Sequence, residues 1–184
     1  MRLAIRLGSD PASDLVLALL RNTGIEVDVS RVDGNLCRVV VLIEPHGEKR
    51  LVLEPGCSMY PSVDTVHGLS LESVGHVHTA MYGAAAQRLI ARCRERGIGW
   101  SMDLEPASFS DGIESLSDMI DGSAVLFLNE RASRRVGKDA ETRLLDMGAR
   151  CVVSTLGPAG ARYRDPDQTL SRRPPPGLRV VDTT

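Results

Sequence analysis

From residue 75 onward, apolar stretches and amphipathic stretches alternate along the chain. The runs "HVHTA", "IGWSMD", "AVLFLN" and "RCVVST" predict four short β-strands, because they are apolar or rich in β-branched residues. Between them, helical periodicity predicts helices over residues 81–97, 111–121 and about 131–147, the second capped by Asp111. Repeated strand–helix units with right-handed crossovers predict an α/β fold with a doubly wound parallel sheet.

The first part of the chain follows a different pattern. Asp10-Pro11 is typical of a helix start, and the helix over "ASDLVLALLRNTG" can close at Gly24 with a left-handed cap. The stretch "CRVVVLIEPHGEKRLVLEPG" places two β-branched runs around the turn-forming residues 45–48. No helix separates these two runs. We therefore expect a β-hairpin at about residues 37–55 that forms its own small sheet.

Composition narrows the function classes. The chain has 184 residues, 42% of them hydrophobic, which is enough for one domain with a sizeable core. A net charge of -2 gives no electrostatic reason to expect nucleic acid or an anionic membrane as partner. The apolar runs are too short to cross a bilayer, and the start shows no signal peptide. The four cysteines form no C-x-x-C pair, so we expect reduced thiols and a cytoplasmic location.

In a doubly wound sheet, ligands bind beyond the carboxyl ends of the strands. At one such end, Thr155, Gly157 and Gly160 lie in "TLGPAG". The glycines would let the backbone approach a phosphate or nucleotide, and the threonine hydroxyl could donate to an oxygen. The alternative is a tight turn entering the hairpin "ARYRDPDQTL", because short glycine motifs often match by accident.

Other polar residues follow neighbouring strands. Asn129 could help to hold an anion at the start of the next helix, or it could simply cap that helix. Asp103 and Glu105 could act as a carboxylate pair, although solvated loop acids are more common. His76 and His78 share one face of a strand, but no nearby acid or thiol completes a metal site. Packed or hydrogen-bonded histidines are therefore favoured.

Taken together, these segments resemble the ribokinase-like, or phosphofructokinase-B type, carbohydrate kinases. The hairpin "CRVVVLIEPHGEKRLVLEPG" looks like the two strands of that family's substrate lid. The segments "SMDLEP", "AVLFLNE" and "VVSTLGPAG" follow in family order, and "VVDTT" is similar to the stretch before the family's Gly-Ala-Gly-Asp anion hole. The order and spacing of the segments carry the match more than any single motif.

The resemblance implies ATP-dependent phosphoryl transfer to a sugar hydroxyl, with ATP and magnesium as cofactors. It implies that Asn129 contacts the nucleotide phosphates and that Thr155, Gly157 and Gly160 line the nucleotide pocket. Asp182 matches an aspartate that helps to hold a monovalent cation in many family members. The small-molecule partner would be a sugar or sugar derivative, and lid hairpins in this family often pair two subunits.

The resemblance also predicts that residues 1–184 form only part of a kinase domain, truncated at both ends. The family's catalytic base would lie beyond Thr184, so no residue here matches it. The family often has Asn-x-x-Glu after the strand that matches "AVLFL", but here the third residue after Asn129 is Ala132. These departures predict an inactive or incomplete kinase. The alternative is a non-catalytic remnant that binds a nucleotide or sugar and acts as an interaction protein.

Overall fold

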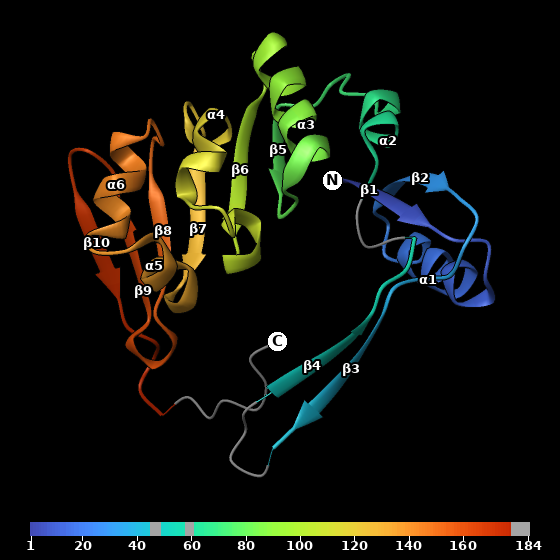
Figure 1. The fold of residues 1–184 in the computed structure, drawn as a ribbon, viewed down its shortest axis with the longest axis horizontal. Coiled ribbons are helices and arrows are strands. Elements are labelled where there is room, and N and C mark those ends of the chain that lie inside the picture. The colour runs from blue at the N-terminus through green and yellow to red at the C-terminus, as the bar shows by residue number, and fades with distance from the viewer. Residues whose placement is uncertain (45–48, 58–60, 178–184) are drawn as a thin grey trace. The chain divides into compact units, whose positions relative to one another are not determined.

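A computed structural model describes residues 1–44, 49–57 and 61–177. The chain divides into two compact units, Met1–Ser70 and Leu71–Thr184, which are considered separately below. Asp182 lies outside the described residues, and so does the rest of the "VVDTT" segment that contains it. The structure confirms an α/β fold with a mostly parallel central sheet and a small antiparallel hairpin (Figure 1).

The first unit contains a β-α-β segment in which β1 (Arg2–Leu7) and β2 (Glu26–Arg31) pair in parallel around α1 (Pro11–Arg21). Asp10 caps α1 as predicted and accepts hydrogen bonds from the backbone amides of Ala12 and Ser13. The pKa of Asp10 is lowered, first by the hydrogen bond from the Ser13 hydroxyl and then by backbone amides that include Leu36. The helix start is thus built around one aspartate.

The predicted hairpin is present as a separate two-stranded sheet. Strands β3 (Arg38–Ile43) and β4 (Lys49–Glu54) run antiparallel, while the expected turn at residues 45–48 lies outside the described residues. The unit ends with α2 (Val63–Gly68), a short helix capped by Ser62 that the sequence pattern did not indicate. The hairpin prediction is confirmed, and one helix was missed.

The second unit is built on a six-stranded sheet with the order β10-β9-β8-β7-β6-β5 (Figure 1). Four strands are parallel, and β9 and β10 extend the sheet in antiparallel fashion. The strand bounds are β5 (His76–Thr79), β6 (Gly99–Leu104), β7 (Val125–Asn129), β8 (Val152–Thr155), β9 (Ala161–Arg164) and β10 (Thr169–Arg172). The last two strands form the hairpin that "ARYRDPDQTL" predicted.

Alternate residues of the central strands form the core of this unit. Along β6 and β7 the buried apolar residues are two apart, as the side-chain period of a strand requires: Trp100, Met102, Leu104, Leu126 and Leu128. The indole Nε1 of Trp100 donates to the carbonyl of Met119 at 2.8 Å, so its one polar atom is satisfied inside the core. No helix in the described part of the chain is both long and apolar enough to cross a membrane.

Two of the predicted helices are wrong in detail. The helix expected over residues 131–147 is broken into α5 (Glu130–Val136) and α6 (Ala140–Asp146). Gly137 and Asp139 have φ of 111° and 55°, which a continuous right-handed helix cannot contain. The helix expected from residue 111 is instead a 3₁₀ turn (Ile113–Leu116) followed by the single helical turn of α4 (Ser117–Ile120).

The start of that second segment also differs from the prediction. Gly112, with φ of 102°, directly precedes the 3₁₀ turn, so Asp111 is not its cap. The helix expected from residue 81 is present as α3 (Gly83–Glu95), with Met81 before its first turn. In both places the chain enters its helix through a glycine with positive φ, at Gly112 and Gly83. Such a conformation has no periodicity that a hydrophobic pattern could reveal.

Candidate functional site

The carboxyl ends of the parallel strands surround a cavity of about 400 Å³. Its lining comes from β5, β6 with the loop after it, β7 and β8: His78, Asp103, Glu105, Phe127, Leu128, Asn129 and Thr155. Asn129 and Thr155 are direct neighbours in the register of β7 and β8. Four of the residues that the sequence singled out as candidates are therefore brought together at the expected edge of the sheet: Asp103, Glu105, Asn129 and Thr155.

The side chain of Asn129 holds two structural elements together. Its Oδ1 accepts a hydrogen bond from the backbone amide of Ala132 at 2.8 Å, which caps α5. Its Nδ2 donates to Oε1 of Glu105 at 3.3 Å. The capping role is confirmed. A second role at the phosphates of a nucleotide is compatible with its place in the cavity lining and stays a prediction.

The two glycines of the loop after β8, Gly157 and Gly160, have different surroundings. A Cβ at Gly160 would overlap the carbonyl oxygen of Arg172, and φ at this glycine is 97°. The tight-turn interpretation therefore explains Gly160 fully. Gly157 also has a positive φ, 53°, but nothing lies within 4 Å of the position of its missing Cβ. Of the two glycines, only Gly157 leaves open space for a ligand, and among residues 155–160 only Thr155, the last residue of β8, lines the cavity.

The lining of the cavity is acidic. Asp103 and Glu105 supply two carboxylates, and the lining residues that the structure describes include no lysine or arginine. Among the described residues, no three His, Cys, Asp or Glu side chains are grouped closely enough to hold a metal ion by themselves. This arrangement fits magnesium, which usually binds one or two carboxylates together with substrate phosphates and water. Asp182, the predicted cation ligand, lies outside the described residues and stays a prediction.

The two histidines of β5 are hydrogen-bonded, as expected. Nε2 of His76 and Nδ1 of His78 each lie 2.9 Å from Oγ of the buried Ser101 on β6. The ring of His78 also meets Phe127 edge to face, with centroids 5.7 Å apart. Sequence reasoning missed His78 and Phe127 as lining residues. Strand alternation could have found Phe127, because its neighbours Leu126 and Leu128 are in the core.

None of the four cysteines forms a disulfide bond, and Cys93 and Cys151 are buried. Burial raises the pKa of both of these thiols, which disfavours the reactive thiolate. The pKa of Tyr163 is raised to about 12, mainly by the hydrogen bond that its hydroxyl donates to Asp165 at 2.6 Å. These groups pack and bond structurally, and none lines the cavity.

A match to a family model identifies the class of protein. Residues 1–184 match the pfkB family of carbohydrate kinases, and the chain belongs to that family. No curated protein matched the chain.

Solved structures show the same fold. A ribokinase from Thermotoga maritima is 19% identical, with a TM-score of 0.77 over 100% of this chain and 62% of its own. A Burkholderia thailandensis nucleoside kinase in complex with inosine is 15% identical, with a TM-score of 0.80 over 98% of this chain and 60% of its own. A protein assigned as ribokinase II of E. coli, in complex with ATP and Mg²⁺, is 14% identical, with a TM-score of 0.80 over 97% and 64%. The chain thus spans less than two thirds of the length of each of these three proteins.

Proposed function

We propose that this chain carries the phosphate-side part of an ATP-dependent kinase site that phosphorylates a hydroxyl of a sugar or nucleoside. The observation that supports the proposal is the pairing of Asn129 with Thr155 at neighbouring strand ends, in one cavity with Asp103 and Glu105. This is the edge of a parallel sheet at which α/β proteins bind their ligands. Membership in the pfkB family supports the same reaction class.

Magnesium follows from the charge of the cavity lining. ATP carries several negative charges, and the described part of the lining offers two carboxylates and no lysine or arginine. Direct contact between phosphates and Asp103 or Glu105 would be repulsive. A magnesium ion, when bound, would neutralise both sides, and Asp103 and Glu105 are placed to hold it through one or two oxygens. ATP binding by this chain should therefore require magnesium.

The other residues then take distinct roles. Asn129 would donate from Nδ2 to a phosphate oxygen while Oδ1 keeps its bond to the amide of Ala132. The exposed hydroxyl of Thr155 would donate to a second oxygen, and Gly157 would let the backbone approach the nucleotide. Gly160 would shape the nucleotide pocket indirectly, by allowing the tight turn of the loop, and would not contact the nucleotide itself. Asp182 would help to hold a monovalent cation.

We expect the 184-residue chain alone to bind Mg-ATP only weakly. The described lining residues include no lysine or arginine and leave few strong bonds to the phosphates, so a millimolar Kd, or about 4 kcal/mol of binding energy, is expected. Calorimetric titration with ATP, with and without magnesium, measures this. Micromolar binding, or equal binding without magnesium, would contradict the proposed arrangement. A cytoplasmic location belongs to the proposal, since cysteines without disulfide bonds fit a reducing compartment.

Phosphoryl transfer is tested by a coupled assay with a panel of sugars and nucleosides. We expect no detectable product from the chain alone, since no described residue matches the base of the family and general-base help is worth about 10²–10⁴-fold. Robust turnover would overturn the expectation of an incomplete kinase and would also identify the acceptor. Tight, micromolar binding of a sugar or nucleotide without turnover would instead fit the alternative, a non-catalytic interaction protein. The buried Ala132, at the position of the family glutamate, favours that alternative.

A second copy of the chain is the proposed partner of the hairpin. Residues opposite each other in β3 and β4 share a face, and one face of the hairpin is aliphatic except for Lys49 opposite Ile43: Val39, Val41, Ile43, Leu51 and Leu53. These side chains are 41 to 67% exposed, and a surface of this kind usually packs against a partner. Val41→Lys should shift sedimentation toward monomer, whereas Leu42→Lys on the other face should have a smaller effect. A wild-type chain that sediments as a monomer at high concentration would refute this pairing.

A further inference from the structure

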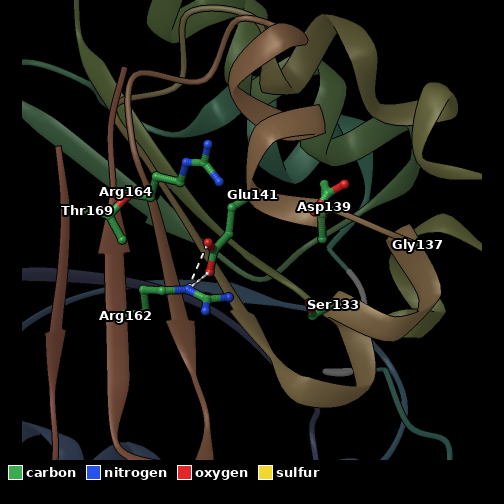
Figure 2. Close-up of a pocket in the computed structure, with 8 residues that line it drawn as sticks. Ser133, Gly137, Asp139, Glu141, Arg162, Arg164 and Thr169 are labelled. Atoms are coloured by element: carbon green, nitrogen blue, oxygen red, sulfur yellow. Dashed lines mark hydrogen bonds and ion pairs between the residues drawn. The ribbon is translucent and has the colours of Figure 1, made fainter. Parts of the chain in front are cut away.

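A second cavity of the Leu71–Thr184 unit lies between the α5–α6 linker and the edge strands (Figure 2). Its volume is about 280 Å³, and it shares no lining residue with the candidate kinase site. Its polar lining comes from both helices, β9 and β10: Ser133, Asp139, Glu141, Arg162, Arg164 and Thr169. Nothing in the proposed kinase reaction uses these residues.

A buried ion pair forms one wall of this second cavity. Glu141 is only 5% exposed, and its Oε1 accepts from the hydroxyl of Ser154 at 2.5 Å. Nε of Arg162 donates to both carboxylate oxygens, at 2.8 and 2.9 Å (Figure 2). These contacts use Nε and leave the two terminal nitrogens of Arg162 without a hydrogen bond to any described residue. Glu141 thereby holds Arg162 in place, while the two terminal guanidinium nitrogens of Arg162 stay available to a ligand.

Arg164 adds a second positive charge to the lining of the same cavity. It lies two residues further along β9, so both arginines project from the same face of the strand. The side chain of Arg164 makes no ion pair and no hydrogen bond within the described ranges. Asp139 also lines the cavity, but it is exposed and makes no ion pair with either arginine in the part of the chain that the structure describes.

The backbone of the linker supports a built site. Asp139 is a non-glycine residue with φ of 55°, a left-handed conformation that is rare outside glycine and persists only where the surrounding structure holds it. The linker is anchored from outside by Arg143, whose Nη1 donates to the carbonyl of Val136 at 2.7 Å. The wall opposite the arginines is therefore held in a defined shape.

We propose that this cavity binds the carboxylate of a small hydroxy acid. Arg162 and Arg164 bring two positive charges and Glu141 brings one negative charge, so these three side chains have a net charge of +1 that would attract an anionic ligand. Counting the exposed Asp139 makes the lining neutral, so a dianionic phosphate is disfavoured further. An arginine fork matches the planar carboxylate, and the hydroxyls of Ser133 and Thr169 suit the hydroxyl groups of the ligand. The volume fits a small ligand only.

The test is an NMR titration of the ¹⁵N-labelled 184-residue chain with sodium glycerate, with glycerol and inorganic phosphate as comparisons. We expect saturable shifts with glycerate at the amides of residues 137–141 and 161–164. Arg164→Gln should weaken glycerate binding about tenfold or more, since a hydrogen bond to a charged group contributes about 1.5–3 kcal/mol. Asp139→Asn, which tolerates the same backbone conformation, should tighten it about twofold.

Two controls separate this site from other causes. Arg172→Gln removes an exposed arginine of β10 that does not line the cavity, and glycerate binding should not change. Thr155→Val alters the proposed kinase site and should also leave it unchanged, so failure of one proposal does not imply failure of the other. Equal binding of glycerol, tighter binding of phosphate than of glycerate, or an unaffected Arg164→Gln variant would each overturn the assignment.

Discussion

Replacing Asn129 by serine separates its capping role from the proposed role at the nucleotide. Serine is as good an N-cap as asparagine, so the bond to the amide of Ala132 can be retained. The shorter side chain has no amide group to replace Nδ2, which now reaches Glu105 at 3.3 Å. If Nδ2 contacts a phosphate when ATP binds, the variant should fold normally and bind Mg-ATP more weakly.

The structure sets the size of both effects. Loss of the cap in Asn129→Ala should cost about 1 kcal/mol of unfolding free energy, or about 2–4 °C in Tm for a chain of this size. Asn129→Ser should keep most of that stability. One donor to a charged oxygen contributes about 1.5–3 kcal/mol, so both variants should bind Mg-ATP about tenfold or more weakly.

Two assays on the three proteins decide between the roles. Thermal unfolding by circular dichroism measures the cap, and a Mg-ATP titration followed by NMR measures the contact. If Asn129→Ser unfolds and binds Mg-ATP like the wild type, Asn129 is a cap only and its proposed nucleotide role is wrong. A loss of affinity that follows stability alone across the variants would lead to the same conclusion.

Three further predictions concern the fold around the two cavities. Gly160→Ala should lower the unfolding free energy by at least about 2 kcal/mol, because the new Cβ meets backbone, whereas Gly157→Ala should cost only about 1 kcal/mol in a urea titration. Arg162→Met should cost about 2 kcal/mol by leaving the buried Glu141 without its cation, and a cost below 0.5 kcal/mol by the same titration, about that of an exposed ion pair, would contradict this. The lowered pKa of Asp10 stabilises the fold above its ordinary pKa of about 3.9, so stability should fall below about pH 4. Asp10→Asn should show a shallower fall in urea midpoint between pH 5 and 3.

The sequence predicted the strands well and the helix boundaries less well, for a physical reason. Ala132, Val136, Ala140 and Leu144 are four residues apart and all buried, so the pattern reads as one continuous helix. The break at Gly137 preserves that row while changing the backbone, and no periodicity reveals it. The 3₁₀ turn Ile113–Leu116, which begins after Gly112 and leads into α4, was not predicted for the same reason.

Part of the candidate site followed from topology alone. Asn129 and Thr155 were placed at the same edge because parallel strands end together, and the register confirms that they are neighbours. His78 and Phe127 also line the cavity, with side chains on the less buried face of the sheet. Which side chains meet on that face depends on how the strands pair. The interaction of Glu141 with Arg162 joins α6 to β9 across 21 residues, and no local pattern predicts it.

The central claim is that the cavity at the carboxyl ends of β5 to β8 receives the phosphates of Mg-ATP. The most direct measurement is a residue-resolved NMR titration of the 184-residue chain with ATP, with magnesium and with EDTA. We expect millimolar, magnesium-dependent shifts centred on Asn129, Thr155 and Gly157, with little change at residues 137–141. Shifts that persist in EDTA, or that cluster away from these three residues, would contradict it.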